Sequence, residues 1–155
     1  MSISEEFIKA KGKPIIYNDK KLRMQAEFAF SDNQIEFKLE IMKTNSEMRQ
    51  GLIVASEGDI IINNKTYSKI ILWEDTAPKE VLLTVKSKDK RFSVYNVWQK
   101  EQRTEAWYND SYMELLKKIN NSYFFSCSDG KINSMEKTLD FKIEFENNNV
   151  KMIDF

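Results

Sequence analysis

Apolar and polar residues alternate along much of this chain, and the alternation limits the folds that the chain can adopt. The clearest example is Leu139–Phe145, in which apolar residues at the odd positions alternate with Asp140, Lys142 and Glu144. A period of two places one set of side chains in a core and the other set in water, as in a strand of an antiparallel sheet. The same pattern, in places weaker, occurs at 22–30, 35–41, 81–85 and 92–98.

Short polar segments separate these strands. Ser31-Asp32-Asn33 predicts a hairpin between the first two strands, and Asn63-Asn64-Lys65 separates 59–62 from 66–73. Further turns are expected at 87–90 and at 147–149, before a final strand at 150–153. Asn tolerates the left-handed conformation of tight turns and can replace glycine, of which the chain has only 4. We therefore expect an all-β fold, an antiparallel β-sandwich of about eight to ten strands.

The chain has 155 residues, the size of one domain, and no linker or internal repeat divides it. We predict a single β-sandwich domain over 1–155, in which residues 1–12 form a helical N-terminal extension. Ser2-Ile3-Ser4-Glu5 has the pattern of a capping box, which predicts a short helix from about Ser4 to Lys11. Gly12 and Pro14 would end that helix.

The segment 110–119 fits two structures. As a helix, it would place Met113, Leu116 and Ile119 on one face, and as a strand it would place Met113, Leu115 and Ile119 on one face. We favour the strand, joined through Asn120-Asn121 to a second strand at 122–126.

The absence of histidine excludes several kinds of chemistry. The chain has 0 His and 1 Cys, which removes Ser-His and Cys-His nucleophiles, His-ligated metals and intrachain disulfides. We therefore assign no catalytic residue, no metal site and no cofactor. Cys127 is expected to act as a small, buried, inert apolar residue. Lys and Arg together number 24, as do Asp and Glu, and this balance disfavours a nucleic-acid partner.

The expected cellular compartment is inferred from the targeting and membrane-spanning segments that the sequence lacks. The N-terminal residues contain no apolar segment of a signal peptide, and the apolar runs are too short to cross a bilayer. A single cysteine suits a reducing compartment. We expect a cytoplasmic protein that does not contact a membrane.

The most distinctive segment is ILWEDTAPKEV, residues 71–81. The continuous apolar run up to Trp73 predicts a strand buried on both faces. In one interpretation, which we favour, Asp75 bonds a backbone N–H two residues on and fixes a turn, and Pro78 restarts an extended chain. In the other, Trp73, Glu74 and Asp75 lie at a strand end and grip a sugar or a cationic side chain.

Two further sets of residues are candidates for binding. Aromatic residues with a polar tip gather at binding surfaces, although in a sandwich many of them fill the core. The aromatic candidates are Tyr95, Trp98, Trp107 and Tyr108. The second set is basic and surrounds an expected hairpin, so that it could meet a phosphate or an acidic partner, or form a solvated tip. Its members are Lys88, Lys90 and Arg91.

Three segments, ILWEDTAPKEV, VYNVW and SCSDG, resemble a family of small, uncharacterised bacterial proteins. Members have an L-W-x-D-T-A-P-like segment, an N-V-W-like strand and a C-N-D-like turn, and the resemblance covers roughly residues 60 to 145. Ser128 stands where the last motif would have Asn. The resemblance implies a bacterial or phage origin and an all-β core, and it implies no activity, cofactor or site residue.

These observations favour a non-catalytic binding protein that neutralises or scaffolds another macromolecule, as an immunity protein does. One alternative is a small-ligand module that binds a carbohydrate on the aromatic residues or a signalling nucleotide on the basic residues. The other is a carboxylate-dependent hydrolase. Its candidate acids, Glu74, Asp75, Asp110 and Asp129, are too common a residue type to be specific.

Overall fold

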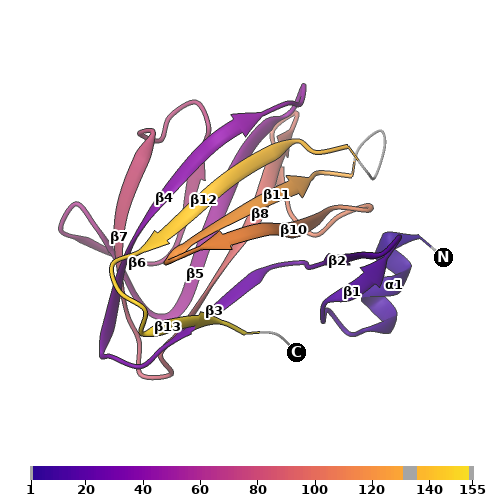
Figure 1. Ribbon diagram of the computed structural model, residues 1–155. Helices are drawn as coiled ribbons and strands as arrows, with labels where there is room; N and C mark the ends of the chain where they lie inside the picture. Colours follow the sequence, from indigo (N-terminus) through magenta and orange to yellow (C-terminus); the bar gives the residue numbers. More distant parts are fainter. Residues whose placement is uncertain (1, 131–135, 154–155) are drawn as a thin grey trace.

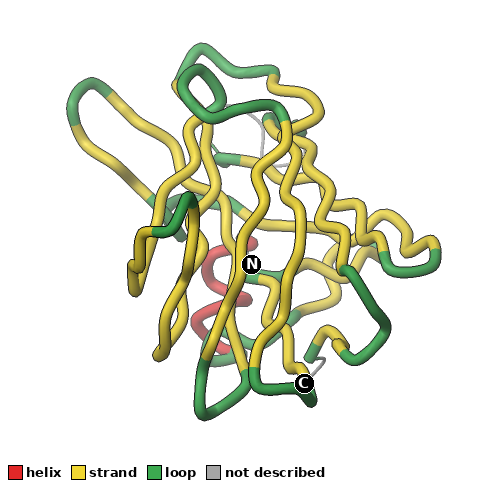
Figure 2. The backbone as a smooth tube through the Cα atoms, turned by 90° about the vertical axis from the view of Figure 1, so that its left-hand side faces the viewer, coloured by secondary structure: helices red, strands yellow, loops and turns green. Residues whose placement is uncertain are grey.

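The computed structural model describes residues 2–130 and 136–153. Within them the chain forms one α-helix and a series of strands (Figure 1; Figure 2). In chain order the elements are α1 (Ile3–Lys9), β1 (Ile15–Tyr17), β2 (Lys20–Leu22), β3 (Ala26–Phe30), β4 (Gln34–Thr44), β5 (Arg49–Ile62), β6 (Lys65–Trp73), β7 (Glu80–Lys86), β8 (Arg91–Lys100), β9 (Arg103–Glu105), β10 (Tyr112–Ile119), β11 (Ser122–Ser128), β12 (Leu139–Phe145) and β13 (Val150–Met152).

The main sheet contains eleven antiparallel strands and curls into a half-barrel (Figure 1). Its strands follow the order β10-β11-β12-β4-β7-β5-β8-β3-β13, with β6 added on β5 and β9 added on β8. The predicted all-β antiparallel fold is confirmed. The structure adds that these strands belong to one curled sheet and that β1 and β2 form a small separate sheet.

Strand β5 joins the two halves of the curled sheet. Its first part, from Arg49 to Ala55, pairs with β8, and its last part, from Asp59 to Ile61, pairs with β7. The pairing of β5 with β6 shifts register between Ala55 and Ile60, which marks a bulge where the strand bends. Gly58 lies in this bulge against the backbone of Lys86.

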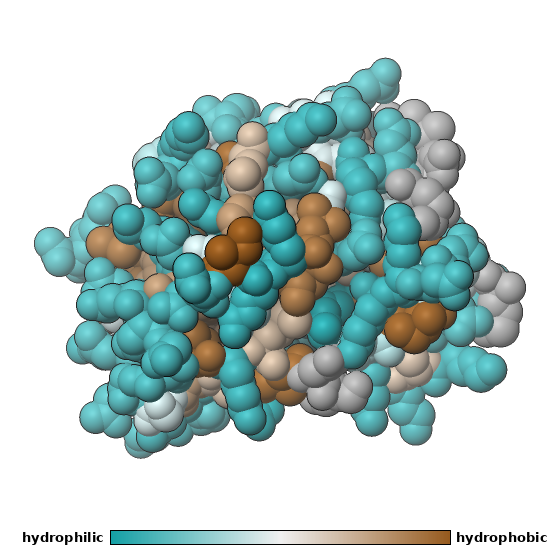
Figure 3. Space-filling model, viewed as in Figure 1, coloured by the Kyte–Doolittle hydropathy of each residue, from teal (hydrophilic) through white to brown (hydrophobic). Residues whose placement is uncertain are grey.

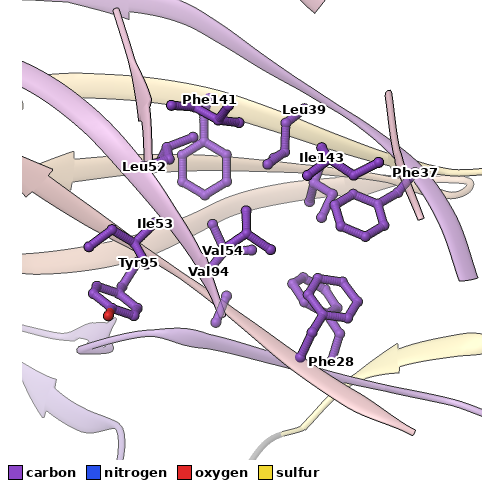
Figure 4. Packing of buried hydrophobic residues seen from close by; sticks show 14 of the residues in the cluster. Phe28, Phe37, Leu39, Leu52, Ile53, Val54, Val94, Tyr95, Phe141 and Ile143 are labelled. Atoms are coloured by element: carbon purple, nitrogen blue, oxygen red, sulfur yellow. The ribbon is translucent and has the colours of Figure 1, made fainter. Parts of the chain in front are cut away.

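The concave side of the sheet holds the main core. Leu52, Val54 and Phe141 face the same interior in Figure 4, which also contains a group of aromatic rings. Phe37 and Phe92 stack there, with ring centroids 4.6 Å apart. Ile53 and Tyr95 are opposed across β5 and β8, and they point to the other side of the sheet (Figure 4). Both faces of these two strands are therefore covered.

The N-terminal residues form a small unit that packs on β10. A second apolar cluster holds it in place, made by Ile3, Phe7, Ile15, Leu22 and Tyr112. Helix α1 has the predicted cap, in which the Ser2 hydroxyl accepts a hydrogen bond from the Glu5 N–H at 3.2 Å. The predicted N-terminal helix is confirmed, and it ends at Lys9.

Two predicted hairpins are confirmed. β5 and β6 are joined by Asn63 and Asn64, which have φ angles of 50° and 63°. Residues 112–128 form the β10–β11 hairpin, with Asn120 at φ 52° in its turn. The ambiguous segment 110–119 is therefore largely a strand.

Other local predictions are wrong. The turn at 31–33 does not make a hairpin, because β3 pairs with β8 and β13 whereas β4 pairs with β7 and β12. The turn at 87–90 does not make one either, because β5 lies between β7 and β8. The single strand expected over 22–30 is interrupted between β2 and β3.

The run Ile70-Ile71-Leu72-Trp73 is not buried on both faces. Strand β6 pairs only with β5, so it lies at an edge of the described sheet, and Ile71 is 39% exposed. Its apolar character reflects one covered face and an edge position.

Alanine at Gly58 tests the bend in β5. An added Cβ would lie 2.1 Å from the Lys86 carbonyl oxygen and 2.7 Å from the Ser87 Cα, and these backbone atoms cannot rotate away. We expect Gly58→Ala to lower the free energy of unfolding by about 2–3 kcal/mol in urea denaturation. Glu57→Ala, an exposed neighbour in the same bulge, should change it by less than about 0.5 kcal/mol. Equal losses in the two variants would contradict this explanation.

Candidate functional site

A buried polar cluster around Gln50, near the start of β5, connects three distant parts of the chain. The Gln50 amide donates hydrogen bonds to the Asp129 carboxylate at 3.0 Å and to the Met48 carbonyl at 3.2 Å. Its oxygen accepts a hydrogen bond from the Thr138 hydroxyl at 3.0 Å. The Asp129 carboxylate also accepts a hydrogen bond from Ser46 at 2.9 Å. Because buried polar groups are costly unless they are paired, this cluster fixes its members relative to one another.

The turn after β6 is attached to the backbone of Gln50. The Glu74 carboxylate accepts hydrogen bonds from the Gln50 N–H at 2.6 Å and from the Thr44 hydroxyl at 3.0 Å. The Glu74 N–H in turn donates to the Gln50 carbonyl at 2.9 Å. Glu74 is therefore a residue that holds three strands together.

Arg49 contacts the other two candidate residues of the 71–81 segment, Trp73 and Asp75. Its Nε donates to the Asp75 carboxylate at 2.7 Å, and its guanidinium lies 4.5 Å from the centroid of the Trp73 ring. Asp75 thus bonds a side chain of β5, and the turn itself is closed by the Ala77 N–H bonding to the Trp73 carbonyl at 2.9 Å. A cationic side chain does meet Trp73 and Asp75, and it belongs to the same chain.

The SCSDG segment and the NVW segment meet beside this cluster. The Asn96 amide, on β8, donates to the Ser128 carbonyl at 3.1 Å. Gly130 follows with φ 70°, and a Cβ there would lie 2.6 Å from the Ser111 backbone nitrogen. The close approach fixes the 107–111 loop against the end of β11. All three distinctive segments of the sequence therefore serve one structural junction.

The 107–111 loop presents two exposed aromatic residues, Trp107 and Tyr108. Trp107 has φ 56°, which is unfavourable for a bulky side chain, and its indole N–H donates to the Met24 carbonyl at 2.9 Å. Its ring lies over Tyr95, with centroids 4.2 Å apart. Despite these restraints Trp107 is 45% exposed, and the adjacent Tyr108 is 57% exposed.

A groove of about 400 Å³ lies between this loop and helix α1. One side is formed by Ser4, Phe7 and Ile8 of the helix and by Lys11 and Gly12 after it, and the other side by Met24, Trp107, Tyr108, Asn109 and Ser111. The Asp110 carboxylate accepts a hydrogen bond from the Ser4 N–H at 2.9 Å, and this bond ties the helix to the loop. Ile8 is 78% exposed. The groove is therefore a fixed, largely apolar depression and our candidate site.

A second depression, of about 500 Å³, lies along β6, where the exposed Tyr67 and Ile71 line it together with Ile62, Ile70 and Leu72. On the face shown in Figure 3, hydrophobic side chains form separate patches among hydrophilic ones, and one patch lies at the right of the view, where the N-terminal unit is placed. The α1 side differs from β6 in presenting two exposed aromatic rings at its groove, Trp107 and Tyr108, where β6 presents Tyr67 alone.

The remaining predicted binding residues divide into two groups. Trp98 is 1% exposed and Tyr95 is buried, so neither can present its ring to a ligand at the surface, contrary to the expectation of an aromatic platform. Lys88, Lys90 and Arg91 lie in or beside the β7–β8 connection. The depression there is also lined by Glu57, Asp59 and Asp89, which offset the positive charges.

Cys127 and the four acids considered for hydrolysis are engaged within the fold. Cys127 is fully buried on β11, and this burial raises the pKa of its thiol well above the usual range. Each of the four acids considered for hydrolysis has a protein partner: Gln50 for Glu74, Arg49 for Asp75, Ser4 for Asp110 and Ser46 for Asp129. The described residues contain no group of three acidic or cysteine side chains that could hold a metal ion.

Comparison with known proteins gives no relative from which a role could be transferred. No protein-family model, no curated protein sequence and no solved structure matches the chain. The part of the chain that the structure describes has no helix long and apolar enough to span a bilayer. Functional inference therefore depends on the groove and on the cluster that supports it.

Replacing Gln50 by methionine tests the buried cluster. Methionine has a similar shape, but it leaves the Asp129 carboxylate and the Thr138 hydroxyl without the Gln50 amide. We expect Gln50→Met to lower the free energy of unfolding by about 2–3 kcal/mol in urea denaturation. The same change at Gln99, a half-buried residue opposite Arg49, should cost less than about 1 kcal/mol. A Gln50→Met variant as stable as the natural protein would contradict this role.

Tyr112, next to the groove residue Ser111, gives a test by pH. Its hydroxyl is buried without a hydrogen-bond partner among the described residues. Burial, followed by repulsion from Glu114 and Cys127, raises the pKa of Tyr112 from 10.0 to about 12. Between these values the unfolded chain loses the Tyr112 proton and the folded chain keeps it, so the stability that is present below pH 10 falls as the pH rises.

We expect Tyr112→Phe to leave stability at pH 7 unchanged or slightly higher, because the hydroxyl has no partner to lose. At about pH 11 the variant should have lost less stability than the natural protein. Urea denaturation at the two pH values measures both effects. Parallel losses in the two proteins would contradict the raised pKa of Tyr112.

Proposed function

We propose that the protein is a non-catalytic, cytoplasmic binding protein that covers part of a macromolecular partner, as an immunity protein covers a toxin. The groove between α1 and the 107–111 loop would be its contact surface. The observation that carries the proposal is the state of Trp107, which is held in place by a hydrogen bond, a ring contact and the loop backbone, yet remains 45% exposed.

A rigid exposed aromatic side chain suits a binding role. Binding usually costs side-chain entropy, and Trp107 has already lost that freedom in the free protein. Its positive φ angle costs on the order of 1–3 kcal/mol, and the surrounding contacts hold Trp107 in this conformation despite that cost. Tryptophan and tyrosine are also the residues that most often dominate the energy of protein interfaces.

Non-catalytic binding is also supported by the positions of the reactive groups. The Cys127 thiol is buried and difficult to ionise, and the loop carboxylates are bonded to Gln50, Arg49, Ser4 and Ser46. A single unpaired cysteine suits a reducing compartment, which favours the cytoplasm.

Capture of a partner tests the proposal. The protein with an affinity tag is immobilised, and proteins of its source cells that bind in stoichiometric amounts are identified. The combined variant Ile8→Ala and Tyr108→Ala truncates two exposed groove residues that are not needed for packing. We expect it to weaken binding of that partner about 30-fold or more, corresponding to at least about 2 kcal/mol at a hot spot.

The matched control is Leu82→Ala on β7, which truncates an apolar side chain of similar exposure, 53%, outside the groove. This variant should bind the partner like the natural protein. Retention of the partner by the groove variant, or the absence of any stoichiometric partner, would contradict the proposal.

A second candidate function is supported by the size of the groove. Its volume of about 400 Å³ lies in the range of small-molecule sites, and Tyr108 and Asn109 place polar groups beside the Trp107 ring, as a carbohydrate site requires. A signalling nucleotide at Lys88, Lys90 and Arg91 has less support, because three acids share that depression.

Thermal unfolding distinguishes the small-ligand candidate. A ligand present at about 100 times its Kd should stabilise the folded protein by about 2.7 kcal/mol, and Tyr108→Ala should reduce the shift. A panel of oligosaccharides and cyclic nucleotides without any shift would exclude this candidate for those ligands.

A further inference from the structure

The charge of the groove indicates which part of a partner it would bind. This step rests on the proposed function. Ser4, Phe7 and Ile8 line the groove from one face of α1, and Lys11 lies beside them, after the helix has ended at Lys9. Lys11 is the only charged residue among the described lining residues, and the groove wall contains no carboxylate. An apolar groove with one positive charge complements an apolar group that carries a negative charge beside it.

The ammonium group of Lys11 is free to make such a contact. It forms no ion pair within the described part of the chain, and its side chain is exposed. The backbone of Lys11 is fixed, because its N–H bonds to the Ile8 carbonyl at 3.1 Å and its φ angle is 57°. Lys9 and Lys13, both exposed, lie two residues away on either side.

Three carboxylates lie close in sequence to the groove, and none of them lines it: Glu6, next to Phe7, and Glu5 and Asp110, which are hydrogen-bonded within the protein. Glu5 accepts a hydrogen bond from the Ser2 hydroxyl at 2.9 Å, and Asp110 accepts one from the Ser4 N–H. On the opposite wall, the Tyr108 hydroxyl and the Asn109 amide make no hydrogen bond to any described residue. The groove therefore offers unused donors to a carboxylate from Lys11, Tyr108 and Asn109.

We infer that the groove binds an acidic segment of a partner protein. One apolar side chain of that segment lies against Trp107 and Ile8, and a neighbouring carboxylate pairs with the Lys11 ammonium. The whole chain has a formal net charge of +0, so its overall charge gives no preference for an acidic over a basic segment. Any such preference has to arise locally, at Lys11 and its neighbours.

Synthetic peptides test this inference. Three short, dye-labelled peptides share the same phenylalanine and leucine anchors and differ only in the flanking residues, which are Glu, Gln or Lys. Binding to the full chain is followed by fluorescence anisotropy. We expect the Glu peptide to bind about tenfold more tightly than the Lys peptide, with the Gln peptide between them, and this difference should shrink at high salt.

Charge reversal at the groove gives the decisive comparison. Lys11→Glu should weaken binding of the Glu peptide about tenfold and strengthen binding of the Lys peptide. The control is Lys65→Glu, at an exposed position of β6, which makes the same change in net charge. It should leave the binding of both peptides unchanged. Equal binding of the three peptides, binding of none, or equal effects of the two variants would overturn the inference. Loss of the captured partner in the Ile8→Ala, Tyr108→Ala variant but not in Lys11→Glu would overturn it while leaving the proposed function intact. Retention of the partner by both variants would overturn the proposed function as well.

Discussion

The side-chain amide of Gln50 is the interaction on which the arrangement of this protein depends. It lies in the interior at the start of β5, where it bonds both Asp129 and Thr138, and its backbone is bonded on both sides to Glu74. Segments that are about 25 to 90 residues apart in the chain are thereby held at one end of the half-barrel. In an interior of low dielectric constant, few other polar groups compete for these hydrogen bonds. An alternative register of β5 would leave several buried polar groups unpaired.

The junction at Gln50 also positions the candidate groove indirectly. Asp129 is followed by Gly130, whose backbone touches Asp110 and Ser111, and Asp110 is bonded to the first turn of α1. A continuous series of contacts thus extends from the start of β5 to both walls of the groove. The opposite face of β5 and β8 contributes as well, because Tyr95 supports the ring of Trp107.

The sequence pattern predicted those strands that have one face on the core and the other in water. Strand β12 alternates strictly because one face lies on the core and the other faces water, and β4 does so over most of its length. The first half of β5 and the centre of β8 carry no such signal, since residues 50–54 and 94–98 are buried on both faces. For the same reason Trp98 could not be distinguished from Trp107 by residue type, although one is interior and the other exposed.

Local sequence patterns also could not predict which distant strands pair with one another. Ser31-Asp32-Asn33 has the composition of a hairpin turn, but the strands on either side pair with other partners. The partners of Glu74 and Asp75 could not be inferred either, because nothing near Gln50 or Arg49 in the sequence indicates that they meet these acids. The wide sequence separation of Gln50, Asn96 and Asp129 explains why local patterns did not indicate that the three unusual segments meet at one junction.

The sheet order has a consequence for how the chain acquires its structure. Strand β4 pairs with β12, and β3 pairs with β13, so strands from the first third of the chain need partners from its last fifth. During synthesis these early strands have no complete set of neighbours until β12 and β13 have left the ribosome. Such non-local pairing slows folding, because a large loop must close before its contacts form. The sheet should therefore be completed only after β12 and β13 have been synthesised, and until then β3 and β4 each have one unpaired edge.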